Sequence, residues 1–324
     1  MSTIAVDAMG GDSAPEEVVK GAILAKKEGV DVILSGDENL IKSYLGNEKI
    51  PVINYPQVIS MDDDPAKAIR SNKDSSIIGA LNLVKEKKAD AVFSAGSTGA
   101  TLIGAISVLG KIKGVTRPTI ASVLPGKEKE VILVDSGANL EVKPKVLYQF
   151  AIMGSKLSEL LFDIENPRIG LINNGEESSK GRELEKATFK LLKSSQLNFI
   201  GNVEGKDFAN SKVDVFVTDG FTGNVVLKTL QGVAKLQQDL ISKSLKENLF
   251  KPLLIPVKNA ISPVKSMLNP NSTNGSYLLG VNGLVIIGHG SSNSEAIKNA
   301  LLFTSRAVEK RFINKFTEVS SELW

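Results

Sequence analysis

The chain has 324 residues, a hydrophobic content of 42%, a charged content of 23% and a formal net charge of +3 at pH 7. These values are typical of a globular protein in water, and the small net charge without a basic tail argues against nucleic-acid binding. The lack of cysteine excludes disulfides, thiolate metal ligands and a cysteine nucleophile, and it fits a cytosolic protein. The sequence shows no secretory leader before TIAVD and no apolar run near the roughly 20 residues that a membrane-spanning helix needs.

Short runs rich in valine and isoleucine alternate with helix-like segments. Such runs are typical of buried parallel strands, and the alternation predicts βαβ units in an α/β protein with a mostly parallel sheet. In chain order we predict a strand from Ala5, a helix at 14–29, strands at 30–36 and 50–54, a helix at 74–88, a strand from Phe93, strands at 119–126 and 130–137, a helix at 142–162, a strand at 168–175, a helix at 177–194, strands from Phe216 and Val281, and a helix at 291–311. We expect a single domain over residues 1–324.

The segment 223–268 departs from this alternation. A helix is predicted from Gly223 to Gln238, and the apolar, basic stretch 240–268 contains three prolines, which exclude one continuous helix. We therefore predict a helical hairpin with an apolar, basic tip at 249–261. Two compatible uses remain open, namely burial in a dimer interface and contact of the tip with an anionic membrane surface.

Five of the apolar runs end in glycine and small polar residues. They read AVDAMGGD, FSAGSTGAT, LVDSGAN, FVTDGFTGN and VNGLVIIGHGSS. Glycine lets the backbone approach a ligand, and the free N–H groups at the start of the next helix attract an anion. Because ligands of parallel sheets bind beyond the carboxyl ends of the strands, we expect these loops to converge on one phosphate-bearing ligand.

Several common motifs are close but incomplete. The dinucleotide fingerprint at Gly288-His289-Gly290 has Asn293 in place of its third glycine, and Ala95 occupies the first glycine position of a nucleophile elbow. Gly126-Lys127 lacks the earlier glycine of a phosphate-binding P-loop. A zinc site is not expected with one histidine and no cysteine, and the acidic run 62–64 before a proline favours a turn that opens a helix over a magnesium site. We expect neither a metal nor a cofactor.

Eight longer motifs occur together in one order. They are DAMGGD (7–12), MDDDPAKAIRSNKDSS (61–76), AGSTGA (95–100), TRPTIASVLPG (116–126), VDSGANLEVKPKVLYQFAIMGS (134–155), LINNGEESSKG (171–181), TDGFTGNVVLK (218–228) and GVNGLVIIGHGSS (280–292). This set resembles the bacterial phosphate acyltransferase family of phospholipid synthesis, which transfers an acyl group from acyl carrier protein to inorganic phosphate. The similarity extends from about Ile4 to Arg311, with a departure at Ser71-Asn72, where the family tends to carry more positive charge.

The resemblance implies a fold, an assembly and a location. The expected fold is a Rossmann-like α/β/α sandwich akin to phosphotransacetylases and isocitrate-dehydrogenase-type folds. The expected assembly is a homodimer without cofactor, attached peripherally to the inner face of the cell membrane. Alternatives are a phosphotransacetylase that uses a short acyl-CoA, a non-catalytic scaffold that binds carrier protein and, on fold grounds alone, a nicotinamide dehydrogenase.

Three residues are expected to act on the reacting groups. Lys180, whose equivalent the family implicates in catalysis, would neutralise phosphate or the developing oxyanion; the alternative is a solvated lysine. Asn224 would donate to the thioester carbonyl, unless it caps a helix. His289 would donate to phosphate or assist the leaving thiol, unless it only holds a neighbouring loop.

Further residues are expected to bind substrates. Ser97 and Thr98 would bind phosphate through hydroxyl groups and helix-start amides, or only cap the helix. Arg70 and Lys73 are expected to contact carrier protein or phosphate. The remaining substrate-binding residues lie in the small-residue loops and are Gly10, Gly11, Asn139, Asn174 and Gly223. Because carboxylates repel phosphate, the aspartates that follow strands, Asp7, Asp135 and Asp219, are expected to orient loops.

Overall fold

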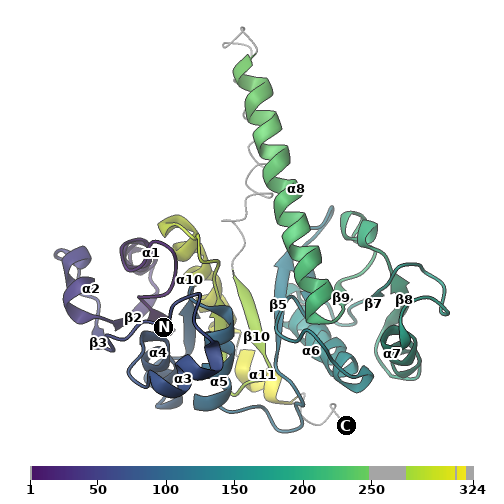
Figure 1. Ribbon diagram of the computed structural model, residues 1–324, viewed down its shortest axis with the longest axis horizontal. Coiled ribbons are helices and arrows are strands. Elements are labelled where there is room, and N and C mark those ends of the chain that lie inside the picture. The colour runs from purple at the N-terminus through teal and green to yellow at the C-terminus, as the bar shows by residue number, and fades with distance from the viewer. Residues whose placement is uncertain (1, 248–274, 311, 319–324) are drawn as a thin grey trace.

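The computed structural model describes residues 2–247, 275–310 and 312–318, and within these one sheet of eleven strands carries helices on both faces (Figure 1). The strands are β1 (Thr3–Asp7), β2 (Asp31–Gly36), β3 (Val52–Asn54), β4 (Ala91–Ser94), β5 (Thr119–Leu124), β6 (Val131–Val134), β7 (Ile169–Ile172), β8 (Phe199–Val203), β9 (Val215–Val217), β10 (Ser276–Leu279) and β11 (Leu284–Ile287). The helices are α1 (Glu16–Lys27), α2 (Glu38–Leu45), α3 (Pro65–Ser71), α4 (Ser76–Lys85), α5 (Thr98–Val108), α6 (Pro144–Phe162), α7 (Glu183–Lys193), the 3₁₀ helix η1 (Gly205–Asn210), α8 (Gly220–Glu247), α10 (Ser294–Glu309) and α11 (Phe312–Glu318).

The sheet is mostly parallel, as predicted. Its strand order is β3-β2-β1-β4-β11-β10-β5-β6-β9-β7-β8. The β10–β11, β10–β5 and β5–β6 pairs are antiparallel, and the other described pairs are parallel. As a result, the strands from β3 to β11 run in one direction, and the strands from β6 to β8 run in the opposite direction.

This reversal corrects the expectation that the five glycine-rich loops share one edge of the sheet. The loops after β1, β4 and β11 lie at one edge, whereas those after β6 and β9 follow strands that run the other way. The reversal arises at the antiparallel pair of β5 and β6. The short strand β10, which the sequence analysis did not predict, is antiparallel to both of its neighbours, so β5 still runs in the direction of β11. The two groups of loops approach each other only near the middle of the sheet.

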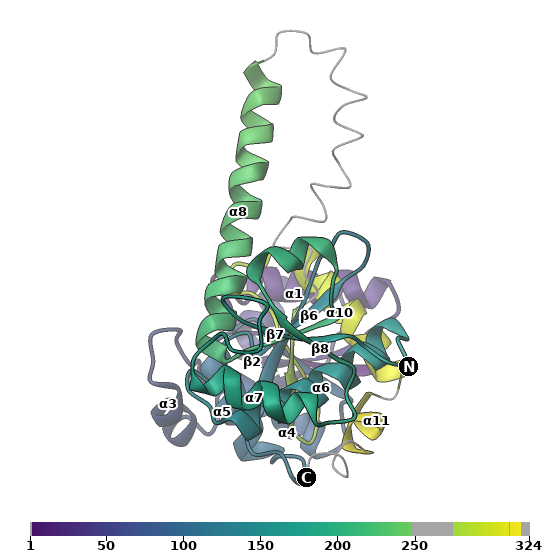
Figure 2. The same cartoon turned by 90° about the vertical axis from the view of Figure 1, so that its right-hand side faces the viewer.

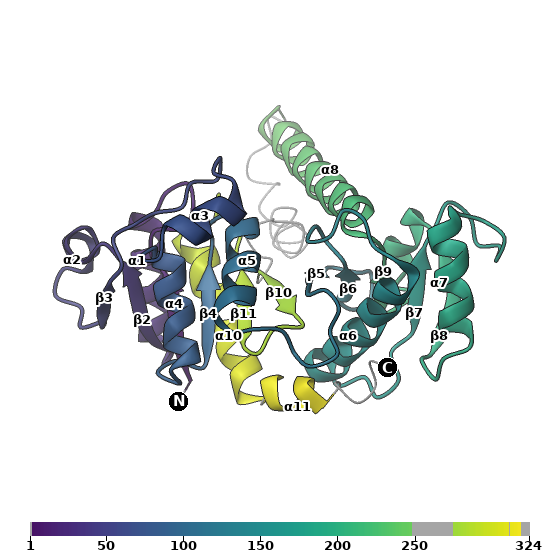
Figure 3. The ribbon, with the colours of Figure 1, turned by 60° about the horizontal axis from the view of Figure 1, so that its bottom comes forward.

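The two faces of the sheet differ in how their cores are built. On one face α1 packs along α10, α6 along α7, and α11 contacts both α10 and α6 (Figure 3). One continuous hydrophobic cluster, which includes Val19, Phe150 and Leu301, spans this face. On the other face the core is divided into one cluster under α4 and α5 and a second under α8 and η1. The boundary between these two clusters lies between α5 and α8.

Helix α8 is longer than predicted and extends away from the rest of the molecule (Figure 2). It begins at Gly220 and spans 28 residues, which corresponds to about 42 Å at the usual rise per residue. The predicted tip at 249–261 and the second arm of the hairpin lie outside the described residues. Among the helices that the structure describes, none is long and apolar enough to cross a membrane.

Candidate active site

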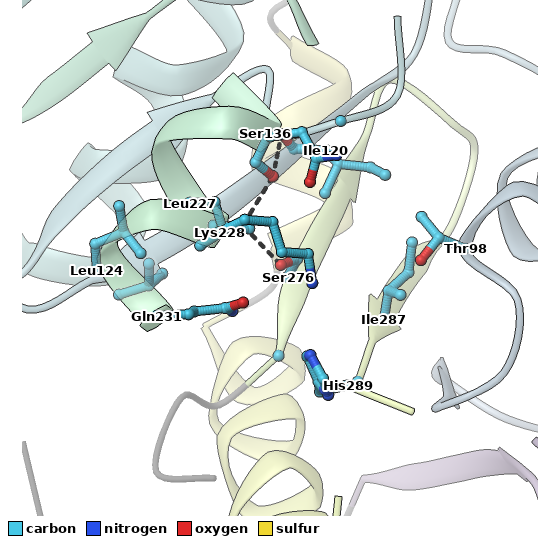
Figure 4. Close-up of a pocket in the computed structure, with 16 residues that line it drawn as sticks. Thr98, Ile120, Leu124, Ser136, Leu227, Lys228, Gln231, Ser276, Ile287 and His289 are labelled. Atoms are coloured by element: carbon cyan, nitrogen blue, oxygen red, sulfur yellow. Dashed lines mark hydrogen bonds between the residues drawn. The ribbon is translucent and has the colours of Figure 1, made fainter. Parts of the chain in front are cut away.

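A cleft of about 250 Å³ lies between α5 and α8, over β5, β10 and β11 (Figure 4). Its polar lining consists of Thr98, Ser122, Ser136, Asn224, Lys228, Gln231, Ser276 and His289. Thr98 and His289 follow strands of the first loop group, whereas Ser136 follows β6 of the second. The cleft thus joins residues from both groups of loops, and it brings together three of the predicted site residues, Thr98, Asn224 and His289.

The first turns of α8 are held against the loop after β6. The Asp219 carboxylate accepts a hydrogen bond from the Thr222 N–H at 2.7 Å and caps the helix. A Cβ atom on Gly223 would lie 1.8 Å from the Asp135 carbonyl oxygen, so only glycine permits this close approach. Asn224 consequently stands in the second turn, against Gly137, with its side chain lining the cleft. The alternative that Asn224 caps the helix is wrong, because Asp219 has that role.

Asp135 organises the loop after β6, as expected for an aspartate that orients a loop. Its buried carboxylate accepts hydrogen bonds from the N–H groups of Gly137, Ala138 and Asn139 at 2.8–3.0 Å. Burial raises the pKa of Asp135, and these hydrogen bonds act in the opposite direction. The Asn139 amide donates to Asp135 and to the Pro118 carbonyl, both at 2.8 Å. Asn139 is buried and stabilises the loop through these two hydrogen bonds.

Three serine hydroxyls form a directed chain along the floor of the cleft. Ser136 Oγ donates to the Ile120 carbonyl at 3.2 Å, and Ser122 Oγ donates to Ser136 Oγ at 2.8 Å. Because the single hydroxyl hydrogen of Ser122 is then used, Ser276 must donate in its 2.8 Å contact with Ser122. The hydroxyl hydrogens all point away from the cleft, and Ser276 presents lone pairs to it.

His289 has a defined tautomer. Its Nδ1 accepts the Ser291 backbone N–H at 3.3 Å and contacts Ser291 Oγ at 2.8 Å. A nitrogen that accepts from a backbone N–H carries a lone pair, so the proton of the neutral ring is on Nε2. Burial lowers the pKa of His289, the charge of Lys228 lowers it further, and Asp12 partly opposes them. His289 is therefore a neutral hydrogen-bond donor at pH 7.

Lys228 is the main cleft residue that the sequence analysis missed. It lies four residues after Asn224 on α8, a spacing that places both side chains on one face of a helix. Figure 4 shows its side chain reaching past Ser276 toward His289. The i, i+4 spacing of asparagine and lysine in GNVVLK was the available signal.

The loop after β1 and residues 95–97 after β4 lie behind the cleft, and of the segment after β4 only Thr98 lines it. A Cβ atom on Gly10 would lie 2.7 Å from the Gly96 nitrogen, and Gly11 has a φ of +121° that favours glycine. The Ser94 hydroxyl donates to the buried Asp7 carboxylate at 2.6 Å, which ties the two loops together. Burial raises the pKa of Asp7.

Ser97 and Thr98, two predicted residues at the start of α5, have different roles. Ser97 Oγ caps the helix and accepts the Ala100 N–H at 3.4 Å, whereas the side chain of Thr98 faces the cleft. Thr98 is therefore the member of this pair that a ligand in the cleft can reach.

Lys180 and Asn174 lie in the loop after β7 and are exposed, and neither lines the cleft. This loop is nevertheless connected to the cleft wall, because the Arg182 guanidinium donates to Asp219, the cap of α8, and also to Glu185. Lys180 lies in the same loop, two residues before Arg182. Arg70 and Lys73 are exposed at and beyond the end of α3 and do not line the cleft either.

Comparison with known proteins gives a consistent result along nearly the whole chain. The family described as fatty acid synthesis protein matches residues 2–315. The phosphate acyltransferase of Halothermothrix orenii is 43% identical over 320 residues, which cover 96% of each chain. The phosphate acyltransferase of Pelotomaculum thermopropionicum is 45% identical over 319 residues, 96% of this chain and 92% of that one.

Among solved structures, the EutD phosphotransacetylase from Staphylococcus aureus has a TM-score of 0.62 at 18% identity, and 94% of this chain and 93% of that chain are covered. At this identity the likeness concerns the fold alone. It confirms the predicted α/β sandwich related to phosphotransacetylases.

Proposed function

The chain belongs to the phosphate acyltransferase family, and from this we propose that it transfers a fatty acyl group from acyl carrier protein to inorganic phosphate. The products are acyl-phosphate, which feeds phospholipid synthesis, and free carrier protein.

The reaction needs alignment and charge stabilisation more than an activated side chain. An oxygen of HPO₄²⁻ attacks the thioester carbonyl carbon, the C–O bond forms, and the C–S bond breaks. The leaving thiolate takes up the proton that the phosphate gives up, so no net proton is exchanged. Alignment of two reactants contributes about 7–11 kcal/mol to lowering the barrier, and one oxyanion donor contributes about 3–4 kcal/mol.

The observation that carries the proposal is a cleft with convergent donors and one lysine, bounded by both halves of the sheet. In this scheme Asn224, held in place by Gly223 and Asp219, donates to the thioester carbonyl oxygen as negative charge develops there. Lys180, from the loop tied to Asp219 through Arg182, neutralises the same charge. No paired nucleophile and base are required.

A phosphotransacetylase reaction is the enzymatic alternative that we keep. The structural neighbours named phosphotransacetylase have the same architecture, so a short acyl-CoA as donor is the second candidate. The identity of the acyl donor distinguishes the two reactions. A non-catalytic scaffold is the third reading, and it requires that carrier protein binds without phosphate-dependent turnover.

The first test measures thiol release from palmitoyl-(acyl carrier protein) with and without phosphate, with acetyl-CoA as the second donor. We expect phosphate-dependent release and acyl-phosphate formation with the carrier-protein substrate. Lys180→Ala and Asn224→Ala should each lower the rate by about tenfold or more, about 1.4 kcal/mol of barrier.

The matched control is Lys27→Ala, an exposed lysine on α1, which packs on the other face of the sheet; it should keep the wild-type rate. Normal turnover in both site variants would contradict the assignment of Lys180 and Asn224. Faster turnover of acetyl-CoA would favour the phosphotransacetylase reading, and carrier binding without turnover would favour the scaffold.

We further propose a homodimer in which α8 contributes to the interface. Val225, Val233, Leu236 and Leu240 are 47–58% exposed and lie on one side of α8. An exposed apolar stripe of this kind is typical of an interaction surface. In sedimentation analysis, the double variant Leu236→Glu/Leu240→Glu should be monomeric, whereas the wild type should be dimeric. Lys235→Glu is the charge control and should stay dimeric.

Attachment to the inner face of the cell membrane remains a proposal that rests on the sequence of 249–261. The segment combines apolar residues with lysines, which suits anionic lipid headgroups. Co-flotation with anionic vesicles, but not with zwitterionic ones, is the expected result for a cytosolic protein held in this way. Equal recovery with both vesicle types would contradict it.

A further inference from the structure

We propose that Lys228 and His289 together hold the phosphate nucleophile, Lys228 through its charge and His289 through its Nε2–H. This assignment rests on the proposed function and adds two points to it. It places the phosphate between α8 and the loop after β11, and it gives His289 a binding role and no role in proton transfer.

The position of Lys228 suits an anion. Its side chain lines the cleft and reaches toward His289 (Figure 4), and no carboxylate of the described residues forms an ion pair with it. Lys228 is exposed to solvent, and its lack of an acidic partner among the described residues distinguishes it from lysines that pair with an acid, as Lys42 does with Glu38. The ammonium group of a lysine that lines a cleft and has no acidic partner can pair with an anionic ligand.

His289 adds a neutral donor at the same place. Because Ser291 fixes Nδ1 as an acceptor, the ring has one N–H left for a ligand, on Nε2. The charged groups that influence the ring are Lys228 and Asp12, and the net effect together with burial is a lowered pKa. A ring that is neutral at pH 7 cannot act as an acid toward the leaving thiol, but it can donate to a phosphate oxygen.

The serines on the floor of the cleft do not donate a hydrogen bond to phosphate. The serine chain ends on the Ile120 carbonyl, so Ser276 offers lone pairs and no hydrogen to the cleft. Lone pairs repel a phosphate oxygen, whereas they suit the ammonium of Lys228. With Asn224 assigned to the thioester carbonyl, the side-chain donors that remain for phosphate are Lys228, His289, Gln231 and the hydroxyl of Thr98.

The chain contains one histidine, which makes the proposal directly measurable. In protein that carries ¹³C-labelled histidine and a purification tag without histidine, the imidazole signals report His289 alone. Titration with inorganic phosphate should shift these signals in the wild type. Lys228→Met should weaken phosphate binding by about tenfold or more, as expected for loss of a hydrogen bond to a charged group.

Lys235→Met is the matched control, because Lys235 lies two turns further along α8, is exposed and does not line the cleft. It should bind phosphate like the wild type. The pH titration of the same signals gives a second readout: His289 should titrate at higher pH in Lys228→Met, since the repulsive charge is gone.

Kinetics separate this proposal from the proposed function. In Lys228→Met the KM for phosphate should rise by about tenfold or more while the KM for acyl carrier protein stays the same, and Lys228→Arg should recover part of the loss. A variant with unchanged phosphate binding and unchanged phosphate KM would overturn the role of Lys228. If the wild type shows no turnover, the proposed function fails, and the phosphate titration still decides whether Lys228 and His289 hold the anion.

Discussion

A single glycine determines where Asn224 stands in the cleft. Gly223 packs against the Asp135 carbonyl, and that contact sets the distance between α8 and the loop after β6. Because Asn224 is the next residue, any outward shift of α8 moves its amide away from the cleft. The position therefore links the packing of a helix with the placement of the group that we propose as the oxyanion donor.

Replacement of Gly223 tests this link. Gly223→Ala would place a methyl group against a backbone oxygen, and we expect a loss of about 3 kcal/mol in the free energy of unfolding together with reduced activity. Gly232→Ala on the same helix has open space around it and should stabilise the protein by about 0.5–1 kcal/mol. Urea denaturation of both variants measures the difference. Equal stability of the two would contradict the packing argument.

At the scale of single residues, the sequence analysis predicted part of the cleft lining. Thr98, Asn224 and His289 were predicted because each follows a strand closely, and all three line the cleft. Lys228 was missed because its place depends on how far α8 leans over the sheet, which is a tertiary property. The tautomer of His289 depends on the Ser291 N–H, which no spacing in the sequence reveals.

At the scale of elements, the strands of the second half are fixed at their amino ends by one carboxylate. Asp214, just before β9, accepts hydrogen bonds from the Arg168 backbone and side chain before β7, and it pairs with Lys129 before β6 at 2.5 Å. Burial acts to raise the pKa of Asp214, but the hydrogen bonds from Arg168 and Lys129 outweigh it and hold the pKa below its usual 3.8.

This pKa predicts a pH dependence of stability. A folded-state pKa below the unfolded value means that the contribution of Asp214 is complete above the unfolded value and is lost as the pH falls through the folded one. We expect Asp214→Asn to cost about 2 kcal/mol at pH 7, and the difference from the wild type to shrink below about pH 4. Denaturation at several pH values checks this. A difference that stays constant into acid would contradict the assignment.

The elements differed in how readily the sequence predicted them. Helices α1, α4, α6, α7 and α10 were predicted because each is at least ten residues long and has clear end signals. The short elements that were not predicted include α2 and the strands β8 and β10, although Asp37 caps α2 and accepts the Leu40 N–H at 3.0 Å. Short elements depend on such single contacts more than on periodicity.

At the scale of the whole molecule, the direction of the sheet was the main feature beyond the reach of the sequence analysis. The apolar runs indicated strands but not their orientation, and the antiparallel β5–β6 pair reverses the direction of the strands from β6 to β8. The cleft lies where the loops of two oppositely directed halves meet, and not at the common edge that we expected.

The continuous core on the face of α1, α6 and α10 has a thermodynamic consequence. Although the cleft separates the halves on one face, they share a single hydrophobic cluster on the other, and α11 contacts helices of both. Neither half can melt without exposing the cluster that supports its neighbour. Scanning calorimetry should therefore show one heat-absorption peak, with equal calorimetric and van't Hoff enthalpies. Two separated peaks would mean that the two halves unfold independently.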